Sequence, residues 1–206
     1  MLKKEYEVLL QFARAPWKKL TFKEAKRLSG KKSESYVYNV LKKYAKRGIL
    51  GEERAGNVVL YSLNLESLKT REYAGFVSEY SSWGRKHVPY KNLEKIASKI
   101  PTAFYTLIVT GSYAKGTQKE DSDIDVAIII DDAAKPKKVY AELRMECELS
   151  IPPIHLYVFK GSEFLQMLID KKPNYGKEIA KNNLILSGGK EYYKIMQEAV
   201  ENGFDG

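Results

Sequence analysis

A polar segment enclosed by two apolar runs constrains this chain more than any other feature of its sequence. The first run, residues 104–109, is rich in β-branched and aromatic residues, which predicts a buried strand. The second run, residues 126–130, predicts another strand on the same grounds. The segment between them opens with Gly111 and Ser112 and closes with two carboxylates. We therefore expect a small polar site between two buried strands.

The Gly-Ser pair is suited to holding a phosphate group. Gly111 has no Cβ, so its backbone can approach a ligand closely. Ser112 is expected to cap a short helix over residues 113–116, which would leave N–H groups and a hydroxyl facing an anion.

The acidic pair is suited to a divalent cation. Asp123 and Asp125 lie two residues apart on the predicted second strand, so both side chains should point to one face. Carboxylates this close repel each other unless a cation lies between them, and Mg²⁺ prefers such oxygen ligands. A phosphate grip beside a metal pair predicts phosphoryl or nucleotidyl transfer.

The spacing of these residues resembles a known signature. Gly-Ser, ten intervening residues and Asp-x-Asp is similar to the motif of the DNA polymerase β-like nucleotidyltransferases, especially the minimal nucleotidyltransferases, over about residues 91–206. The resemblance implies ATP or another NTP as substrate, Mg²⁺ (or Mn²⁺) as cofactor and a hydroxyl as acceptor of the nucleotidyl group. It also implies roles for five residues: the nucleotide would be held by Gly111, Ser112 and Lys115, and the metal by Asp123 and Asp125.

The predicted third strand, residues 154–159, departs from the family pattern. The family usually carries a third carboxylate on this strand, where this chain offers His155. A neutral histidine can accept a proton, but it is a poor substitute for a carboxylate around Mg²⁺. His155 is therefore either a catalytic group or a hydrogen-bonded histidine of the sheet.

Other interpretations of the acidic segment remain open. Residues 121–125 could begin a calcium loop, but such a loop needs Gly at its sixth position and Glu at its twelfth, where this chain has Val126 and Asp132. The segment could also be a solvated acidic turn.

The first third of the chain is strongly basic. Residues 1–68 hold 15 Lys+Arg against 7 Asp+Glu, a net charge of +8, whereas the whole chain has a formal charge of +9. Its pattern predicts helices over residues 2–13, 22–28 and 33–47 and then a hairpin over residues 49–63. Three helices and a hairpin look like a winged helix-turn-helix, and the charge favours nucleic acid.

The third helix would then enter the major groove of double-stranded DNA. We expect base and phosphate contacts from its outer face, from the preceding turn and from the hairpin: Lys31, Lys32, Ser35, Asn39, Lys42, Lys46, Arg54 and Asn57. A protein-interaction role for this module is the alternative.

Several further expectations concern the remaining chain. Residues 65–82 predict a connecting helix whose apolar stripe includes Leu68 and Phe76, and His87 reads as an ordinary surface residue. Residues 185–189 read as a loop. One cysteine, no apolar leader and no apolar run long enough for a membrane span favour a cytoplasmic protein without a membrane partner.

The sequence as a whole predicts an α+β protein. Its expected parts are a winged helix domain (1–68), a connecting helix and linker (69–90) and a mixed-sheet nucleotidyltransferase domain (91–206). The leading hypothesis is an Mg-dependent nucleotidyltransferase, whose acceptor could be a partner toxin encoded nearby. The alternatives are a DNA-binding regulator that only senses nucleotide, and a structural module without a ligand.

Overall fold

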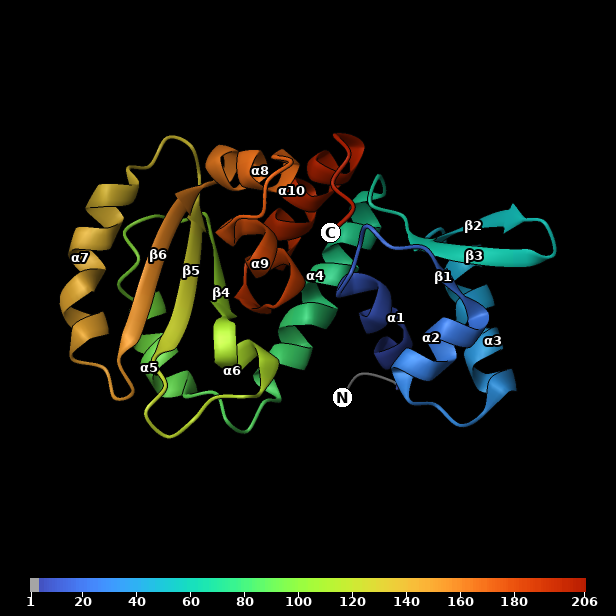
Figure 1. The fold of residues 1–206 in the computed structure, drawn as a ribbon, viewed down its shortest axis with the longest axis horizontal. Helices are drawn as coiled ribbons and strands as arrows, with labels where there is room; N and C mark the ends of the chain where they lie inside the picture. The colour runs from blue at the N-terminus through green and yellow to red at the C-terminus, as the bar shows by residue number, and fades with distance from the viewer. Residues whose placement is uncertain (1–3) are drawn as a thin grey trace.

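The computed structural model describes residues 4–206, and its N-terminal part joins helices to a small sheet (Figure 1). The predicted start of the first helix, residues 2–3, lies outside the described residues. The elements of this part are α1 (Tyr6–Ala13), β1 (Leu20–Thr21), α2 (Phe22–Ser29), α3 (Glu34–Lys46), β2 (Leu50–Ala55) and β3 (Val58–Leu63).

Side-chain caps fix where the N-terminal helices begin. Thr21 and Glu24 form a capping box, in which Thr21 Oγ1 accepts from Glu24 N at 3.2 Å and Glu24 Oε2 accepts from Thr21 N at 2.8 Å. Ser33 Oγ accepts from Tyr36 N at 3.2 Å and starts α3. The sheet order is β1-β3-β2. The two-residue β1 was not predicted, because a strand of that length has no detectable periodicity.

The second part is built around a mixed sheet of order β6-β5-β4-β7, in which β5 and β6 are parallel and the other pairs antiparallel. The fold is therefore α+β, as predicted. The elements of this part are α4 (Leu68–Trp83), α5 (Tyr90–Ala97), β4 (Tyr105–Thr110), α6 (Gly111–Lys115), β5 (Ile124–Ile130), α7 (Pro136–Glu148), β6 (Ile154–Lys160), α8 (Gly161–Ile169), α9 (Tyr175–Lys181), β7 (Leu184–Ser187) and α10 (Gly189–Glu201).

The central strands are buried on both faces. On β4, Leu107 and Val109 pack with α5 and α7, whereas Ile108 packs in the core of α8 and α10. Figure 1 shows α7 on the outer side of β6 and α9 and α10 beside α4, which also packs directly against β7. Cys147 lies inside the α7 layer, and burial raises the pKa of its thiol to about 11. A buried thiol with a raised pKa is a poor nucleophile, so Cys147 is a packing residue.

Helix α4 is more than a connection. Gly75 meets Gly189 backbone to backbone, because a Cβ on Gly75 would lie 2.7 Å from the Gly189 carbonyl carbon. Ser78 Oγ lies 2.7 Å from Tyr193 Oη, which donates to Ala13 O at 2.8 Å. Helices α1, α4 and α10 are thus joined in one hydrophobic core.

The predicted apolar stripe of this helix was partly wrong. Leu68 and Phe76 are exposed, whereas Ala74, Val77 and Ser78 are buried. The buried face is made of small residues because α10 approaches closely, and a pattern of large apolar residues does not reveal such a face.

The predicted loop at 185–189 was also wrong. Leu184–Ser187 forms β7, which pairs antiparallel with β4 through Ile108↔Ile185 and Val109↔Leu184. The strand is only four residues long, so its assignment depends on the partner strand. In the part of the chain that is described, no helix combines the length and apolarity that crossing a bilayer requires.

Candidate functional site

The site begins where β4 runs into α6. Thr110, the last residue of β4, pairs with Asp125 of β5, which places the Asp125 carboxylate beside the turn at Gly111. Gly111 has φ +64°, and a Cβ there would lie 2.1 Å from Asp125 Oδ2. Position 111 therefore requires glycine for two reasons: its positive φ, and the space next to its Cα that the Asp125 carboxylate fills. We expected this space to admit a ligand, but here it admits Asp125.

The second carboxylate is close to the first. Asp123 precedes the start of β5 at Ile124 and is exposed, whereas Asp125 is half-buried. Burial raises the pKa of Asp125 above its ordinary value; His155 opposes this effect, and the charge of Asp123 adds to it. The negative charges of Asp123 and Asp125 are therefore close enough to affect each other's ionisation.

The two carboxylates are candidate ligands for a divalent cation. Across residues 4–206, the nearest polar partner found for either carboxylate is His155 Nδ1, 3.6 Å from Asp125 Oδ1. No group of three or more His, Cys, Asp or Glu residues in that range forms a metal cluster. Mg²⁺ is commonly held by one or two carboxylates together with water and substrate phosphates, so two adjacent hard ligands fit it.

His155 lies on β6, the strand on which the family pattern predicts a third carboxylate. It pairs with Asp125 across the parallel strands β5 and β6, and its Nδ1 is 3.6 Å from Asp125 Oδ1. This distance exceeds that of a hydrogen bond, and the contact is an ion pair only when the imidazole is protonated. Nδ1 also lies 3.2 Å from the hydroxyl of Tyr157, and the His155 side chain is 61% exposed.

Aromatic residues extend the site along β6. The ring centroids of His155 and Tyr157 are 4.6 Å apart, and those of Tyr157 and Tyr175 are 4.4 Å apart. Burial raises the pKa of Tyr175, with smaller contributions from Tyr157 and Asp125. Neither tyrosine was predicted. Alternation along β6 could have placed Tyr157 on the face of His155, but no local signal marks Tyr175, which comes from α9.

Helix α6 differs from its predicted form. It begins at Gly111 rather than after Ser112, so Ser112 lies in its first turn and does not cap it. Lys115 is exposed at its last position. His87, expected to be ordinary surface, is half-buried, and its Nε2 lies 2.9 Å from Tyr113 O. It therefore supports α6 from the linker side, a contact that only the tertiary structure creates.

A comparison with protein families found a match in the C-terminal part of the chain. Residues 91–186 match the family model of the nucleotidyltransferase domain. We refer to this segment as the nucleotidyltransferase domain. No curated protein matches the chain. A solved structure described as a crystal structure of a toxin-antitoxin with AMP-PNP is similar at 15% identity and a TM-score of 0.40, over 55% of this chain and 87% of that one.

The predicted DNA contacts lie outside the nucleotidyltransferase domain, on α3, the turn before it and the β2–β3 hairpin. Six of the eight residues are exposed: Lys32, Ser35, Asn39, Lys46, Arg54 and Asn57. The other two form ion pairs within the protein, Lys31 with Glu7 and Lys42 with Glu52 at 2.9 Å. Pairing reduces the positive charge that Lys31 and Lys42 can offer to a phosphate.

Proposed function

We propose that the nucleotidyltransferase domain transfers a nucleotidyl group, such as AMP from ATP or another NTP, to a hydroxyl acceptor with Mg²⁺ or Mn²⁺. The acceptor oxygen would bond to the α-phosphorus while the bond to the β-phosphate breaks and pyrophosphate leaves. The observation that carries this proposal is the placement of the Asp125 carboxylate against Gly111, next to Asp123, inside a segment that matches a nucleotidyltransferase model. Two protein carboxylates at the start of a strand and a glycine turn one strand away supply the two kinds of group that this chemistry needs.

Each residue of the site has a role in this proposal. Asp123 and Asp125 would hold the metal, which when bound would stabilise negative charge on the phosphates. Gly111 and Ser112 would line the phosphates with backbone N–H groups and a hydroxyl, and Lys115 would add a positive charge near them.

His155 would act on the acceptor. As a neutral imidazole beside Asp125 it could take the proton of the attacking hydroxyl, and the resulting imidazolium would be stabilised by the Asp125 carboxylate. A hydrogen bond between Tyr157 Oη and His155 Nδ1 would orient the imidazole ring. Tyr157 and Tyr175 offer ring faces near the site on which a base or an aromatic acceptor could pack.

The test is transfer from ATP labelled at the α-phosphate, with Mg²⁺ or Mn²⁺ and with candidate acceptors that include proteins encoded by neighbouring genes. We expect label on an acceptor with the parent protein and none with Asp125→Asn. Asp121→Asn is the matched control, because Asp121 is exposed and belongs to the same acidic segment. Equal labelling by Asp125→Asn and the parent would contradict the proposal.

A second function is favoured by one observation, namely that a histidine stands opposite Asp125 on β6. A domain with two carboxylates could bind Mg-NTP without completing the transfer, and would then act as a nucleotide sensor. Saturable binding of Mg-ATP by the parent, without transfer to any acceptor tested, would support this alternative.

We further propose that residues 1–68 are a winged helix that binds double-stranded DNA through α3 and the β2–β3 hairpin. Its support is the exposure of Asn39, Lys46 and Arg54 on those elements, together with the net charge of +8. The nucleotidyltransferase domain would in that case act near DNA, or report nucleotide binding to a DNA-bound module.

A further inference from the structure

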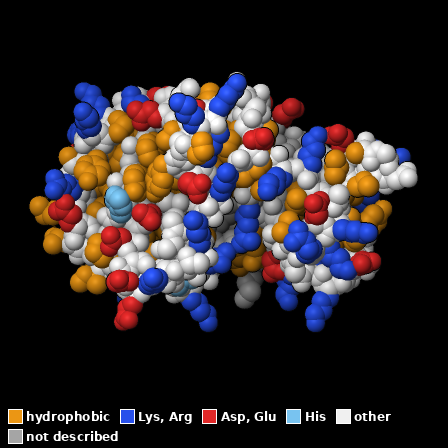
Figure 2. Space-filling view, viewed as in Figure 1, with side chains coloured by type: hydrophobic (Ala, Val, Ile, Leu, Met, Phe, Trp, Pro, Cys, Tyr) orange, Lys and Arg blue, Asp and Glu red, His pale blue; other side chains and the backbone are white. Residues whose placement is uncertain are grey.

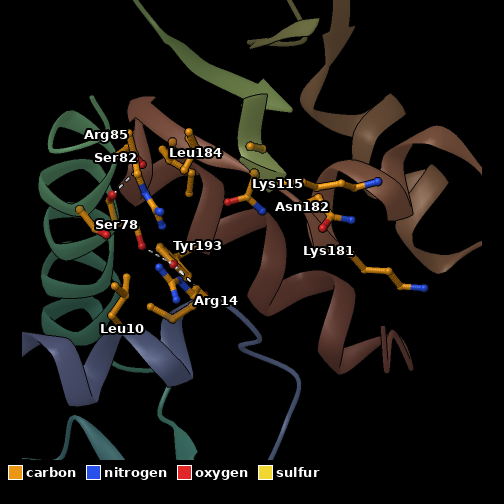
Figure 3. Close-up of a pocket in the computed structure, with 15 residues that line it drawn as sticks. Leu10, Arg14, Ser78, Ser82, Arg85, Lys115, Lys181, Asn182, Leu184 and Tyr193 are labelled. Atoms are coloured by element: carbon orange, nitrogen blue, oxygen red, sulfur yellow. Dashed lines mark hydrogen bonds between the residues drawn. The ribbon is translucent and has the colours of Figure 1, made fainter. Parts of the chain in front are cut away.

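A cavity of about 260 Å³ lies at the junction between the N-terminal part and the nucleotidyltransferase domain. It is bordered by the end of α1, the end of α4, the end of α6 and the segment between α9 and β7 (Figure 3). In the space-filling view, Lys and Arg side chains gather along this junction (Figure 2).

The lining of the cavity is cationic. It contains Arg14, Arg85, Lys115 and Lys181, and no Asp or Glu. None of these four side chains forms an ion pair within residues 4–206. Other cations of the chain, such as Lys31, Lys42 and Lys43, are instead paired with glutamates.

The two arginines face one another. In Figure 3 the guanidinium groups of Arg14 and Arg85 point toward each other across the cavity, whereas the side chains of Lys115 and Lys181 extend away from them. The pKa of Arg14 is lowered, first by burial and then by the positive charge of Arg85. The Arg14 side chain is exposed, although the protein around its charged end still desolvates it in part.

Neutral hydrogen-bonding groups complete the lining. Ser81 and Asn182 lie beside the charged residues, and the hydroxyls of Ser78 and Tyr193 are already paired with each other at 2.7 Å. Two guanidinium groups held together without a carboxylate repel each other, and an anion with several oxygens would remove this repulsion through paired N–H donors.

We propose that this junction cavity binds a phosphate-bearing anion of the size of pyrophosphate, held mainly by Arg14 and Arg85. The inference goes beyond the proposed transfer reaction and does not depend on it. Because Arg14 is the C-cap of α1 and Asn182 is the C-cap of α9, such a ligand would lie between the N-terminal part and the nucleotidyltransferase domain. Its binding would thereby favour one arrangement of the two parts over others.

The experiment is calorimetric titration of the full chain with inorganic pyrophosphate in the absence of divalent cations. We expect saturable binding, at least about tenfold weaker in Arg14→Gln and in Arg85→Gln, because each removes a charge-assisted hydrogen-bonding group. Lys86→Gln is the matched control, since Lys86 neighbours Arg85 but does not line the cavity, and it should bind as the parent does. Thermal melting of the ligand-free variants should show stability equal to or above that of the parent.

Two sources of the phosphate group are separated by a second titration. If the bound phosphate group is part of the NTP of the transfer site, Mg-ATP and pyrophosphate will compete for binding. Arg14→Gln will then also weaken the binding of Mg-ATP. If the phosphate group belongs to a separate ligand, the protein will bind Mg-ATP and pyrophosphate at the same time. Asp125→Asn should leave pyrophosphate binding unchanged in either case, which separates this inference from the proposed reaction. Absence of saturable pyrophosphate binding, or equal binding by the parent and both arginine variants, would overturn the inference.

Discussion

The carboxylate of Asp125 fills the space that a Cβ on Gly111 would need, so the glycine turn and the acidic strand determine each other's position. Gly111→Ala should therefore combine an unfavourable positive φ with a direct clash. We expect it to lower the free energy of unfolding by more than the roughly 1–3 kcal/mol of the backbone effect alone and to abolish Mg-ATP binding, as measured by urea denaturation and calorimetry. Gly56→Ala is the control, because Gly56 has φ +59° with no atom near its Cβ position. Equal losses in the two variants would contradict the packing argument.

Removal of one carboxylate should not harm the metal-free fold. The pKa of Asp125 is raised in the folded state, so its effect on stability favours folding at low pH and is lost as pH rises through that pKa. Asp125→Asn should therefore be as stable as the parent or more so at neutral pH without metal, and should lack this part of the pH dependence. Thermal melting over pH 3–8, a range chosen around the ordinary Asp pKa of about 3.9, measures both effects.

The same variant should lose stabilisation by ligand. In the parent, Mg-ATP at about 100 times its Kd should add roughly 2.7 kcal/mol to the stability of the folded state. Asp123→Asn and Asp125→Asn should show no shift in Tm with Mg-ATP, whereas Asp121→Asn should show the full shift. An undiminished shift in both Asp123→Asn and Asp125→Asn would mean that the acidic pair is not the metal site.

His155 should separate binding from transfer. If it accepts the acceptor proton, His155→Ala should reduce transfer by about 10²-fold or more and leave the Kd for Mg-ATP unchanged, because general-base catalysis contributes about this much. Tyr157→Phe removes only the hydroxyl near Nδ1 and should have a smaller effect. A loss of Mg-ATP binding in His155→Ala, with transfer per bound nucleotide preserved, would instead assign the imidazole to the nucleotide site.

The ion pairs of the N-terminal part determine which lysines we expect to contribute to DNA affinity. Lys46 is exposed and makes no ion pair within the described range, whereas Lys42 is paired with Glu52. Lys46→Gln should weaken binding to a DNA duplex and reduce the slope of log K against log salt by about 1, with a smaller change for Lys42→Gln. Lys137→Gln on α7 is the control. If Lys46→Gln leaves both affinity and salt slope at the values of the parent, α3 is not the DNA face.

Local pattern determined much of this protein. The capping box at Thr21, the cap at Ser33 and the apolar runs of β4 and β5 set where helices and strands begin, because these signals act within a few residues. The acidic pair and the Gly-Ser turn are recognisable because the chemistry proposed for them requires fixed residue types at short spacing.

Only the tertiary structure decided the features that depend on contacts between distant segments. The strand β7 exists because β4 pairs with it, and the buried face of α4 consists of small residues because Gly75 meets Gly189. The pairing of Lys31 with Glu7, the position of His155 opposite Asp125 and the meeting of Arg14 with Arg85 likewise join segments far apart in the chain. No periodicity or motif encodes such meetings, since they arise when packing brings separate surfaces together and exchanges their contacts with water for contacts with each other.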